Sequence, residues 1–139
     1  MKYLSLLAAA FLLVGCVTPN GCGQRALLDY SNIVAPNKVT IEQINGLLHE
    51  HFTSMYDLKK TAIKLGYNCE AKMFENPEEF KKYSGYAILL IKASREKKTE
   101  NHFVLVHAKD GEVYLVDGKK EKFLSLKRDW QGVVLLLSA

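Results

Sequence analysis

Apolar residues recur at helical spacing directly after a Gly-Cys-Gly triplet near the start of the chain. Ala26, Leu27, Tyr30 and Ile33 would share one face of a helix, and the pattern predicts that helix over residues 22–34. A Pro-Asn pair follows and ends it. The apolar face of this helix is expected to pack against the core.

Two further helices are indicated by the residues at their ends. Thr40 precedes an apolar pattern and has Gln43 three residues later, the spacing of a capping box, so a helix is predicted from there to near His51. Ser54 can cap a third helix, which Gly66 ends. The first half of the chain is therefore predicted to be helical.

After Gly66 the pattern changes from helical to extended. A strand is predicted over residues 68–74, followed by a short helix that Asn76 and Pro77 introduce. Residues 86–91 form a nearly continuous apolar run, as expected of a central strand buried on both faces. Residues 94–100 are predicted to be a charged loop.

The end of the chain predicts an antiparallel sheet. Residues 102–108 and 112–117 flank Asp110-Gly111, a strong signal for a tight hairpin. Two more strands are predicted, over residues 123–126 and 133–137. The class is therefore α+β, with N-terminal helices packed on a C-terminal antiparallel sheet. A chain of 139 residues that is 48% hydrophobic suffices for one domain with one core.

The first residues predict export. Residues 3–14 are an uncharged apolar run with the length of a signal-peptide core rather than a membrane span. The run ends in LVGC, which resembles a bacterial lipobox, where the cysteine is acylated and becomes the first residue of the mature protein. We expect residues 1–15 to be a signal peptide with a lipobox ending at Cys16, and residues 17–139 to be an exported, membrane-anchored lipoprotein domain. An ordinary cleaved signal and an uncleaved anchor are the alternatives.

The distribution of charge along the chain argues against a nucleic-acid partner. The formal net charge is +4, from 19 basic and 15 acidic residues that are interleaved along the chain. Interleaved charges favour a solvated surface over a patch for nucleic acid. No nucleic-acid partner is expected.

Cys22 lies between two glycines at the start of the first predicted helix. The backbone N–H groups and dipole of a helix N-terminus favour the thiolate, which is the reactive form of cysteine. Gly21 and Gly23 allow a substrate backbone to approach closely. On these residues alone, a nucleophile and a buried structural thiol are both open.

A thiol nucleophile also needs a base and, usually, a group that orients the base. Among the chain's 4 histidines, His49 and His51 close a polar helix end, where solvated or capping roles are expected. His102 opens a strand directly after the charged loop, at the edge of a predicted cleft. His107 lies further along the same strand.

The predicted hairpin chooses between the two strand histidines. In a two-residue turn, Val104 lies opposite Asp117, and His102 and Asp117 then share a face as diagonal neighbours. His107 pairs with Tyr114 on the other face. A three-residue turn would shift the register by one residue and remove this argument. The parity selects His102 as the histidine that Asp117 can orient.

Taken in order, these features resemble the double-glycine leader peptidases, family 39 of the cysteine peptidases. These papain-like domains occur at the N-termini of bacteriocin-exporting ABC transporters and as standalone proteins. The resemblance covers the whole mature chain, and its motifs are Cys22-Gly23, His102-Phe103-Val104-Leu105, Val113-Tyr114-Leu115-Val116-Asp117 and Trp130-Gln131-Gly132-Val133. It implies a papain-like cysteine peptidase fold.

The resemblance also implies roles for individual residues. Cys22 would be the nucleophile, His102 the general base and acid, and Asp117 the orienting carboxylate, with cleavage after Gly-Gly. Family members usually carry an oxyanion glutamine six residues before the nucleophile, and Cys16, the expected lipidation site, stands there. Asn20 is the nearest side-chain amide that could replace it. Gly21 and Asp117-Gly118 also depart from the family's usual acidic residue and Asp-Pro.

The expected function is that of an exported, membrane-tethered cysteine peptidase acting on a peptide or pro-protein. A weak or inactive peptide-binding module of the same fold is the alternative, and acyl transfer or amide hydrolysis is a third possibility. No metal or cofactor is expected, and no nucleotide, since the chain has no P-loop. The expected partners are the peptide substrate, the membrane through the N-terminal lipid, and a separate export system. Cys69 is expected to be a buried core thiol, and a disulfide from Cys69 to Cys22 would silence the enzyme.

Overall fold

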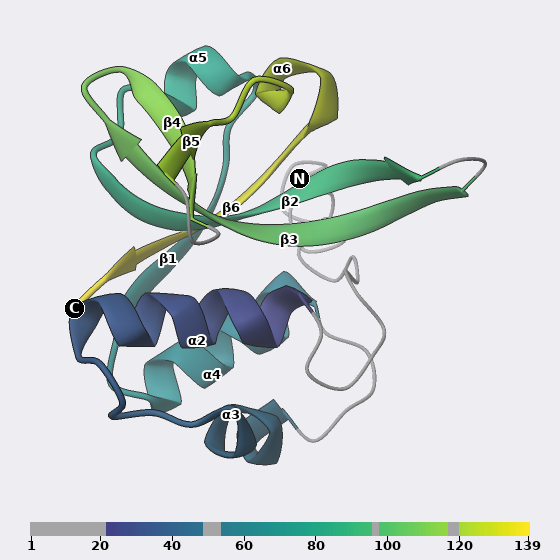
Figure 1. The fold of residues 1–139 in the computed structure, drawn as a ribbon. Coiled ribbons are helices and arrows are strands. Elements are labelled where there is room, and N and C mark those ends of the chain that lie inside the picture. The colour runs from purple at the N-terminus through teal and green to yellow at the C-terminus, as the bar shows by residue number, and fades with distance from the viewer. Residues whose placement is uncertain (1–21, 49–53, 96–97, 117–119) are drawn as a thin grey trace, which may run out of the picture.

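The computed structural model describes residues 22–48, 54–95, 98–116 and 120–139. Three helices come first, and a six-stranded sheet with two short helices follows (Figure 1). The helices are α2 (Cys22–Val34), α3 (Ile41–Leu48), α4 (Met55–Lys64), α5 (Pro77–Phe80) and α6 (Leu126–Asp129). The strands are β1 (Asn68–Met73), β2 (Gly85–Arg95), β3 (Lys98–Lys109), β4 (Glu112–Val116), β5 (Lys120–Lys122) and β6 (Trp130–Ser138). The predicted α+β class is confirmed.

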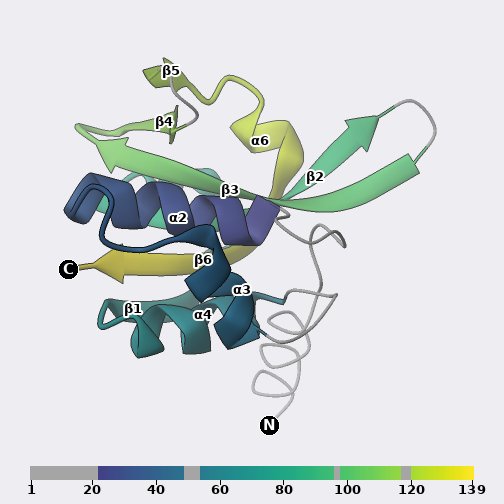
Figure 2. The same ribbon diagram turned by 60° about the horizontal axis from the view of Figure 1, so that its bottom comes forward.

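The sheet has the order β1-β6-β2-β3-β4-β5, and the neighbouring strands are antiparallel. The helices α2, α3 and α4 cover one face, while α5 and α6 lie on the other side (Figure 1). Turning the molecule shows α2 alongside β3 and α4 near β1 (Figure 2). The sheet therefore forms the middle layer and positions the start of α2 against β3.

The core occupies both faces of the sheet. On β2, Ile88 and Leu90 face the three N-terminal helices, while Ala87 and Leu89 alternate toward the opposite face. All four side chains are at most 1% exposed. This two-sided burial explains why the sequence of β2 is a nearly continuous apolar run.

Helix starts follow the predicted capping chemistry. At α3, the N–H of Gln43 donates to Thr40 Oγ1 at 3.2 Å, and the N–H of Thr40 donates to Gln43 Oε1 at 2.8 Å. At α4, the N–H of Asp57 donates to Ser54 Oγ, and the N–H of Ser54 donates to Asp57 Oδ2. Each reciprocal pair satisfies backbone donors that the helix itself leaves unpaired.

The β3–β4 hairpin has the predicted two-residue turn. Lys109 pairs with Glu112, and His107 pairs with Tyr114. The turn residue Asp110 has φ +53° and Gly111 has φ +77°, the left-handed conformation at both positions that tight hairpins require. The register used to choose between the strand histidines is therefore confirmed.

The predicted charged loop over residues 94–100 is wrong. β2 continues to Arg95 and β3 begins at Lys98, so most of that segment pairs as a long hairpin that reaches beyond the rest of the sheet (Figure 1). A paired ribbon that leaves the core needs no alternating apolar face. The polar composition of the segment therefore carried no strand signal.

The strand predicted over residues 123–126 is also wrong. β5 lies earlier, at Lys120–Lys122, and a helical turn begins at Leu126. Phe123 and Leu126 are buried, whereas Leu124 is 92% exposed. Burial at a spacing of three residues fits a turn, which packs two of the apolar side chains and leaves the third in solvent.

Several sequence predictions fall outside the described residues. These are the signal peptide and the residues Cys16, Asn20, His49, His51 and Asp117. Among the helices of the described chain, none has the length and apolar character to cross a membrane.

Candidate active site

Cys22 is the first residue of α2 and is half-buried. The next turns of the helix place Ala26, Leu27 and Tyr30 in the core, with exposures of 4% or less. This packing fixes the start of α2 against the sheet. The backbone N–H of Phe103 on β3 donates to Cys22 Sγ at 3.3 Å.

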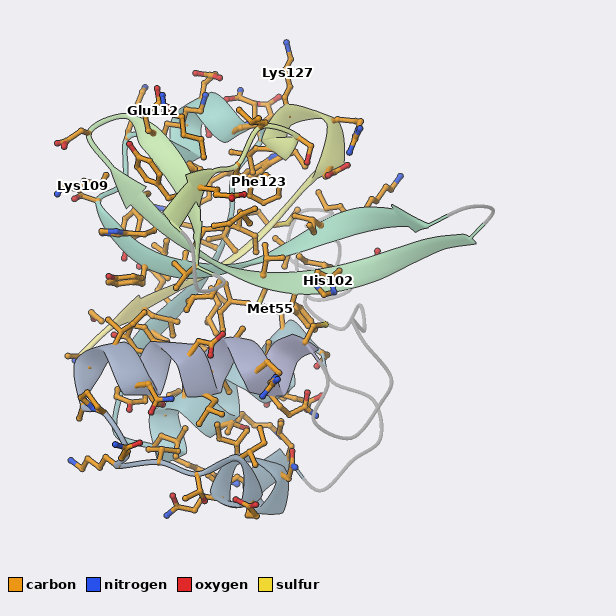
Figure 3. All side chains as sticks on the ribbon, viewed as in Figure 1. Met55, His102, Lys109, Glu112, Phe123 and Lys127 are labelled. Atoms are coloured by element: carbon orange, nitrogen blue, oxygen red, sulfur yellow. The ribbon has the colours of Figure 1, made fainter. Side chains whose placement is uncertain are left out.

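His102 lies on β3 one residue before Phe103 and pairs with Ile91 on β2. The half-buried His102 side chain lies on β3 above the N-terminal end of α2 in Figure 3. Strand N–H groups lie in the plane of the sheet, so the acceptor Cys22 Sγ lies at the edge of β3. The structure thus brings the predicted nucleophile beside the segment that carries the predicted base.

The other strand histidine lies elsewhere. His107 stacks on Tyr86, with ring centroids 4.3 Å apart and an interplanar angle of 11°. Tyr86 in turn packs against Tyr30, two helical turns away from Cys22. His107 therefore belongs to an aromatic cluster at the far end of α2.

The predicted orienting carboxylate lies just past the described part of β4. That strand ends at Val116, and Leu115 pairs with Val106 on β3. The position that the sequence places opposite Val104 lies outside the described residues. The role of Asp117 stays a prediction.

Cys22 is disulfide-bonded in this structure. The partner is not Cys69, which is a free thiol. A disulfide sulfur cannot act as a nucleophile, so any thiol chemistry at Cys22 requires the reduced form.

The sequence predicts a buried core thiol at Cys69; this residue packs against the core cluster but is only half-buried. Its Sγ donates to the carbonyl of Lys59 at 3.6 Å. Burial raises the pKa of the Cys69 thiol, and the positive charge of Lys59 offsets part of this rise. Cys69 is therefore held as a protonated thiol.

Sequence reasoning missed two polar features near Cys22. Gln131 Nε2 donates to Asn101 Oδ1 at 2.8 Å, next to His102. Gln24 is only 3% exposed, and its Oε1 has no hydrogen-bond partner among the residues that the structure describes. Gln24 occupies a buried position on an otherwise apolar helix face, and that mismatch was the available signal. Among the described residues, no cluster of His, Cys, Asp or Glu could hold a metal ion.

Solved structures share this fold across nearly the whole chain. The peptidase domain of Streptococcus ComA, a bi-functional ABC transporter involved in quorum sensing, has a TM-score of 0.66 at 14% identity, over 92% of this chain and 98% of that one. A double glycine motif protease from an AMS/PCAT transporter, in complex with its leader peptide, has a TM-score of 0.63 at 18% identity, over 92% and 93%. The peptidase domain of Streptococcus mutans ComA has a TM-score of 0.51 at 17% identity, over 93% and 100%. The fold is that of these peptidase domains.

The family follows from the sequence itself. The model of the peptidase C39 family matches residues 27–139, so the chain belongs to the peptidase C39 family. The resemblance drawn from the motifs is confirmed at this level. The match begins after Cys22, which it therefore leaves untested. Comparison with curated protein sequences gives no match.

Proposed function

We propose that the protein is an exported, membrane-tethered cysteine peptidase that cuts a peptide or pro-protein after Gly-Gly. Cys22 is the nucleophile, His102 the general base and acid, and Asp117 the group that orients His102. One observation carries the assignment. The N–H of Phe103 donates to Cys22 Sγ at 3.3 Å, which places the first residue of α2 against the strand segment that carries His102.

The chemistry proceeds in two displacements. His102 takes the thiol proton of Cys22, and the thiolate attacks the scissile carbonyl carbon. His102 then gives the proton to the leaving amine as the C–N bond breaks, which leaves a thioester on Cys22. Water attacks the thioester, with His102 taking its proton, and the acid product leaves with Cys22 restored as a thiol. No electrons are exchanged, so the cycle needs no redox partner.

The Gly-Gly preference rests on the relatives. One solved neighbour is a double glycine motif protease in complex with a leader peptide. A leader-like peptide, or a pro-protein carrying the same motif, is therefore the substrate class that we propose. The ComA neighbour is the peptidase domain of an ABC transporter, and we propose an export system as a further partner of this protein.

The absence of the family's usual oxyanion glutamine supports a second candidate function. Cys16 stands where the family usually has a glutamine, which leaves the N–H of Cys22 and the side chain of Asn20 as the proposed donors. A single oxyanion donor contributes about 3 kcal/mol to transition-state stabilisation. Without such a donor, the same fold would bind a peptide and cut it slowly or not at all. A peptide-binding module is therefore the alternative.

Cleavage of a fluorogenic Gly-Gly leader peptide by the mature protein, purified from membranes in detergent with a reductant, tests the peptidase. The variants are Cys22→Ala, His102→Ala and Asp117→Asn, with His107→Ala as the matched control. The first two abolish cleavage, Asp117→Asn slows it severely, and His107→Ala retains it. Binding of the peptide without cleavage by the wild type would instead establish the binding module.

Membrane fractionation tests the anchor. Replacing Cys16 by serine removes the acylated sulfur, so the Cys16→Ser protein should leave the membrane fraction. Cys69→Ser is the matched control, since it changes a cysteine to serine away from the lipobox. Continued membrane association of Cys16→Ser would show an uncleaved apolar anchor in place of a lipid.

A further inference from the structure

Asn101 and Gln131 form a hydrogen-bonded pair beside the proposed nucleophile. Gln131 Nε2 donates to Asn101 Oδ1 at 2.8 Å, and both residues are half-buried. Asn101 immediately precedes His102 on β3, and the N–H of Phe103 donates to Cys22 Sγ. The pair therefore lies at the same end of β3 as the residues to which we assign the chemistry.

Asn101 shares the side of β3 that the N-terminal helices cover. Side chains alternate along a strand, and Phe103 and Leu105 both belong to the core between the sheet and those helices. Asn101 has the same parity. It stands about 7 Å further along the strand than Phe103, since a strand rises about 3.3 Å per residue.

The start of α2 leaves this position uncovered by the helix. α2 runs beside β3 in the same direction, with Cys22 at Phe103 and Tyr30 against Tyr86, which stacks on His107. Residues of β3 that precede Phe103 therefore extend beyond the N-terminal end of α2. Asn101 is the first of them on the helix side of the sheet.

A bulge in β6 brings Gln131 to Asn101 across the intervening strand β2. Leu89 pairs with Val134, whereas Ile91 pairs with Trp130, so one residue of β2 faces three of β6. Gly132 within the bulge has φ +86°, and a Cβ there would lie 2.8 Å from a backbone oxygen. The glycine allows the bulge, and the bulge lets the Gln131 side chain reach the strand beyond its neighbour.

The bond fixes how the Asn101 amide is turned. Its oxygen accepts from Gln131, which leaves the Nδ2 hydrogens as the donors, and no group in the described part of the chain accepts from them. Gly-Gly has no side chains, so a site that selects it must hold the peptide by its main chain. Extended peptides present carbonyl oxygens that need donors.

We infer that Asn101 Nδ2 donates a hydrogen bond to a main-chain carbonyl of the peptide substrate, and that Gln131 is a positioning residue for it. The inference takes the identity of the substrate from the proposed function. Its test does not require that function to be correct. Binding of the peptide can be measured without cleavage. The outcome for Asn101 is thus separate from the outcome for catalysis.

The first experiment measures the Kd of a fluorescent Gly-Gly leader peptide for the full mature protein carrying Cys22→Ala. Adding Asn101→Ala weakens binding about tenfold, as expected for one lost hydrogen bond in a partly buried site. Adding Gln131→Ala weakens it about threefold, and both together weaken it no more than Asn101→Ala alone, because Gln131 acts through Asn101. The matched control is Asn68→Ala, which removes an asparagine amide bonded to the Ala139 carbonyl at 3.1 Å on the edge strand β1.

Kinetics with Cys22 present separate substrate binding from other roles. Asn101→Ala raises KM about tenfold and leaves kcat within about twofold, the signature of an interaction made equally in ground and transition states. In the Asn101→Ala variant, Cys22 reacts with iodoacetamide at the wild-type rate, because this reagent has no extended main chain for Asn101 to bind. The unchanged rate also shows that the variant is folded. An unchanged Kd, or a fall in kcat at unchanged KM, would overturn the inference. A tenfold loss of binding in a protein that never cleaves would uphold it while the peptidase assignment fails.

Discussion

The two cysteines of the described chain are held by hydrogen bonds of opposite direction. Cys22 Sγ accepts a bond from the backbone N–H of Phe103 at 3.3 Å, whereas Cys69 Sγ donates one to the carbonyl of Lys59 at 3.6 Å. An N–H donor stabilises a sulfur that becomes negative, and a carbonyl acceptor stabilises the protonated thiol. Both residues are half-buried. Cys22 is disulfide-bonded and Cys69 is a free thiol, so the two sulfurs differ in covalent state and in hydrogen-bond direction, although both are half-buried.

The elements around each cysteine reinforce that difference. Cys22 opens a helix of 13 residues, where backbone N–H groups favour negative charge. Cys69 lies within β1, and burial raises the pKa of its thiol, although both cysteines pack against the same core cluster. This contrast supports the proposed roles of Cys22 as the reactive cysteine and Cys69 as a structural one.

The largest expected effect is on cleavage. Cys22→Ala should reduce kcat/KM for the Gly-Gly peptide by at least about 1000-fold, because no other group can form the thioester. Cys69→Ala should retain more than about half of wild-type activity, since it lies away from the proposed chemistry. Initial rates under reducing conditions measure both. Equal losses of kcat/KM in Cys22→Ala and Cys69→Ala would contradict the proposal that only Cys22 acts in cleavage.

A second effect concerns thiol reactivity and its dependence on pH. In the reduced protein at pH 7, iodoacetamide should label Cys22 about 100-fold faster than Cys69, because the thiolate is the reacting form. The raised pKa of Cys69 keeps its thiol protonated to higher pH than an ordinary cysteine. Its labelling should therefore increase only in alkaline solution, as followed by peptide mass spectrometry. Comparable labelling rates for Cys22 and Cys69 at pH 7 would contradict the proposed difference in their reactivity.

The sequence could predict the parts of the site that depend on local rules. The glycine before a helical pattern located Cys22, and the Asp110-Gly111 turn fixed the register that separates His102 from His107. These features depend on neighbours in sequence. The Phe103 contact to Cys22 joins residues 81 positions apart, and no periodicity signals it.

Two features needed the three-dimensional structure for the same reason. The bond from Gln131 to Asn101 crosses an intervening strand through a bulge, and bulges leave little trace beyond a glycine. The long β2–β3 hairpin pairs polar residues beyond the core, where no alternation is needed. Long-range register and strands outside the core are what local patterns miss.

A third, smaller effect is on stability. Cys69→Ala should lower the free energy of unfolding by about 1 kcal/mol, through lost packing and the lost thiol hydrogen bond. Cys22→Ala should change it by less than about 0.5 kcal/mol, as expected for a half-buried residue at a helix start, to which we assign a chemical rather than a structural role. Urea unfolding of the reduced variants, followed by circular dichroism, measures the difference. The opposite ranking would make Cys22 the structural thiol.

The smallest effect tests whether unpaired polar groups on α2 belong to the site. Gln24 Oε1, two residues after Cys22, and Ser31 Oγ, further along the helix, are both buried and have no hydrogen-bond partner within the described part of the chain. Ser31→Ala should raise the free energy of unfolding by about 0.5 kcal/mol, from the better helix propensity of alanine and the removal of an unsatisfied hydroxyl. Gln24→Met should raise it by a similar amount. With only 3% of Gln24 exposed, neither change should alter cleavage of the Gly-Gly peptide. Loss of cleavage in Gln24→Met but not in Ser31→Ala would show that the Gln24 amide contacts the peptide. The proposed site would then extend by one turn along α2.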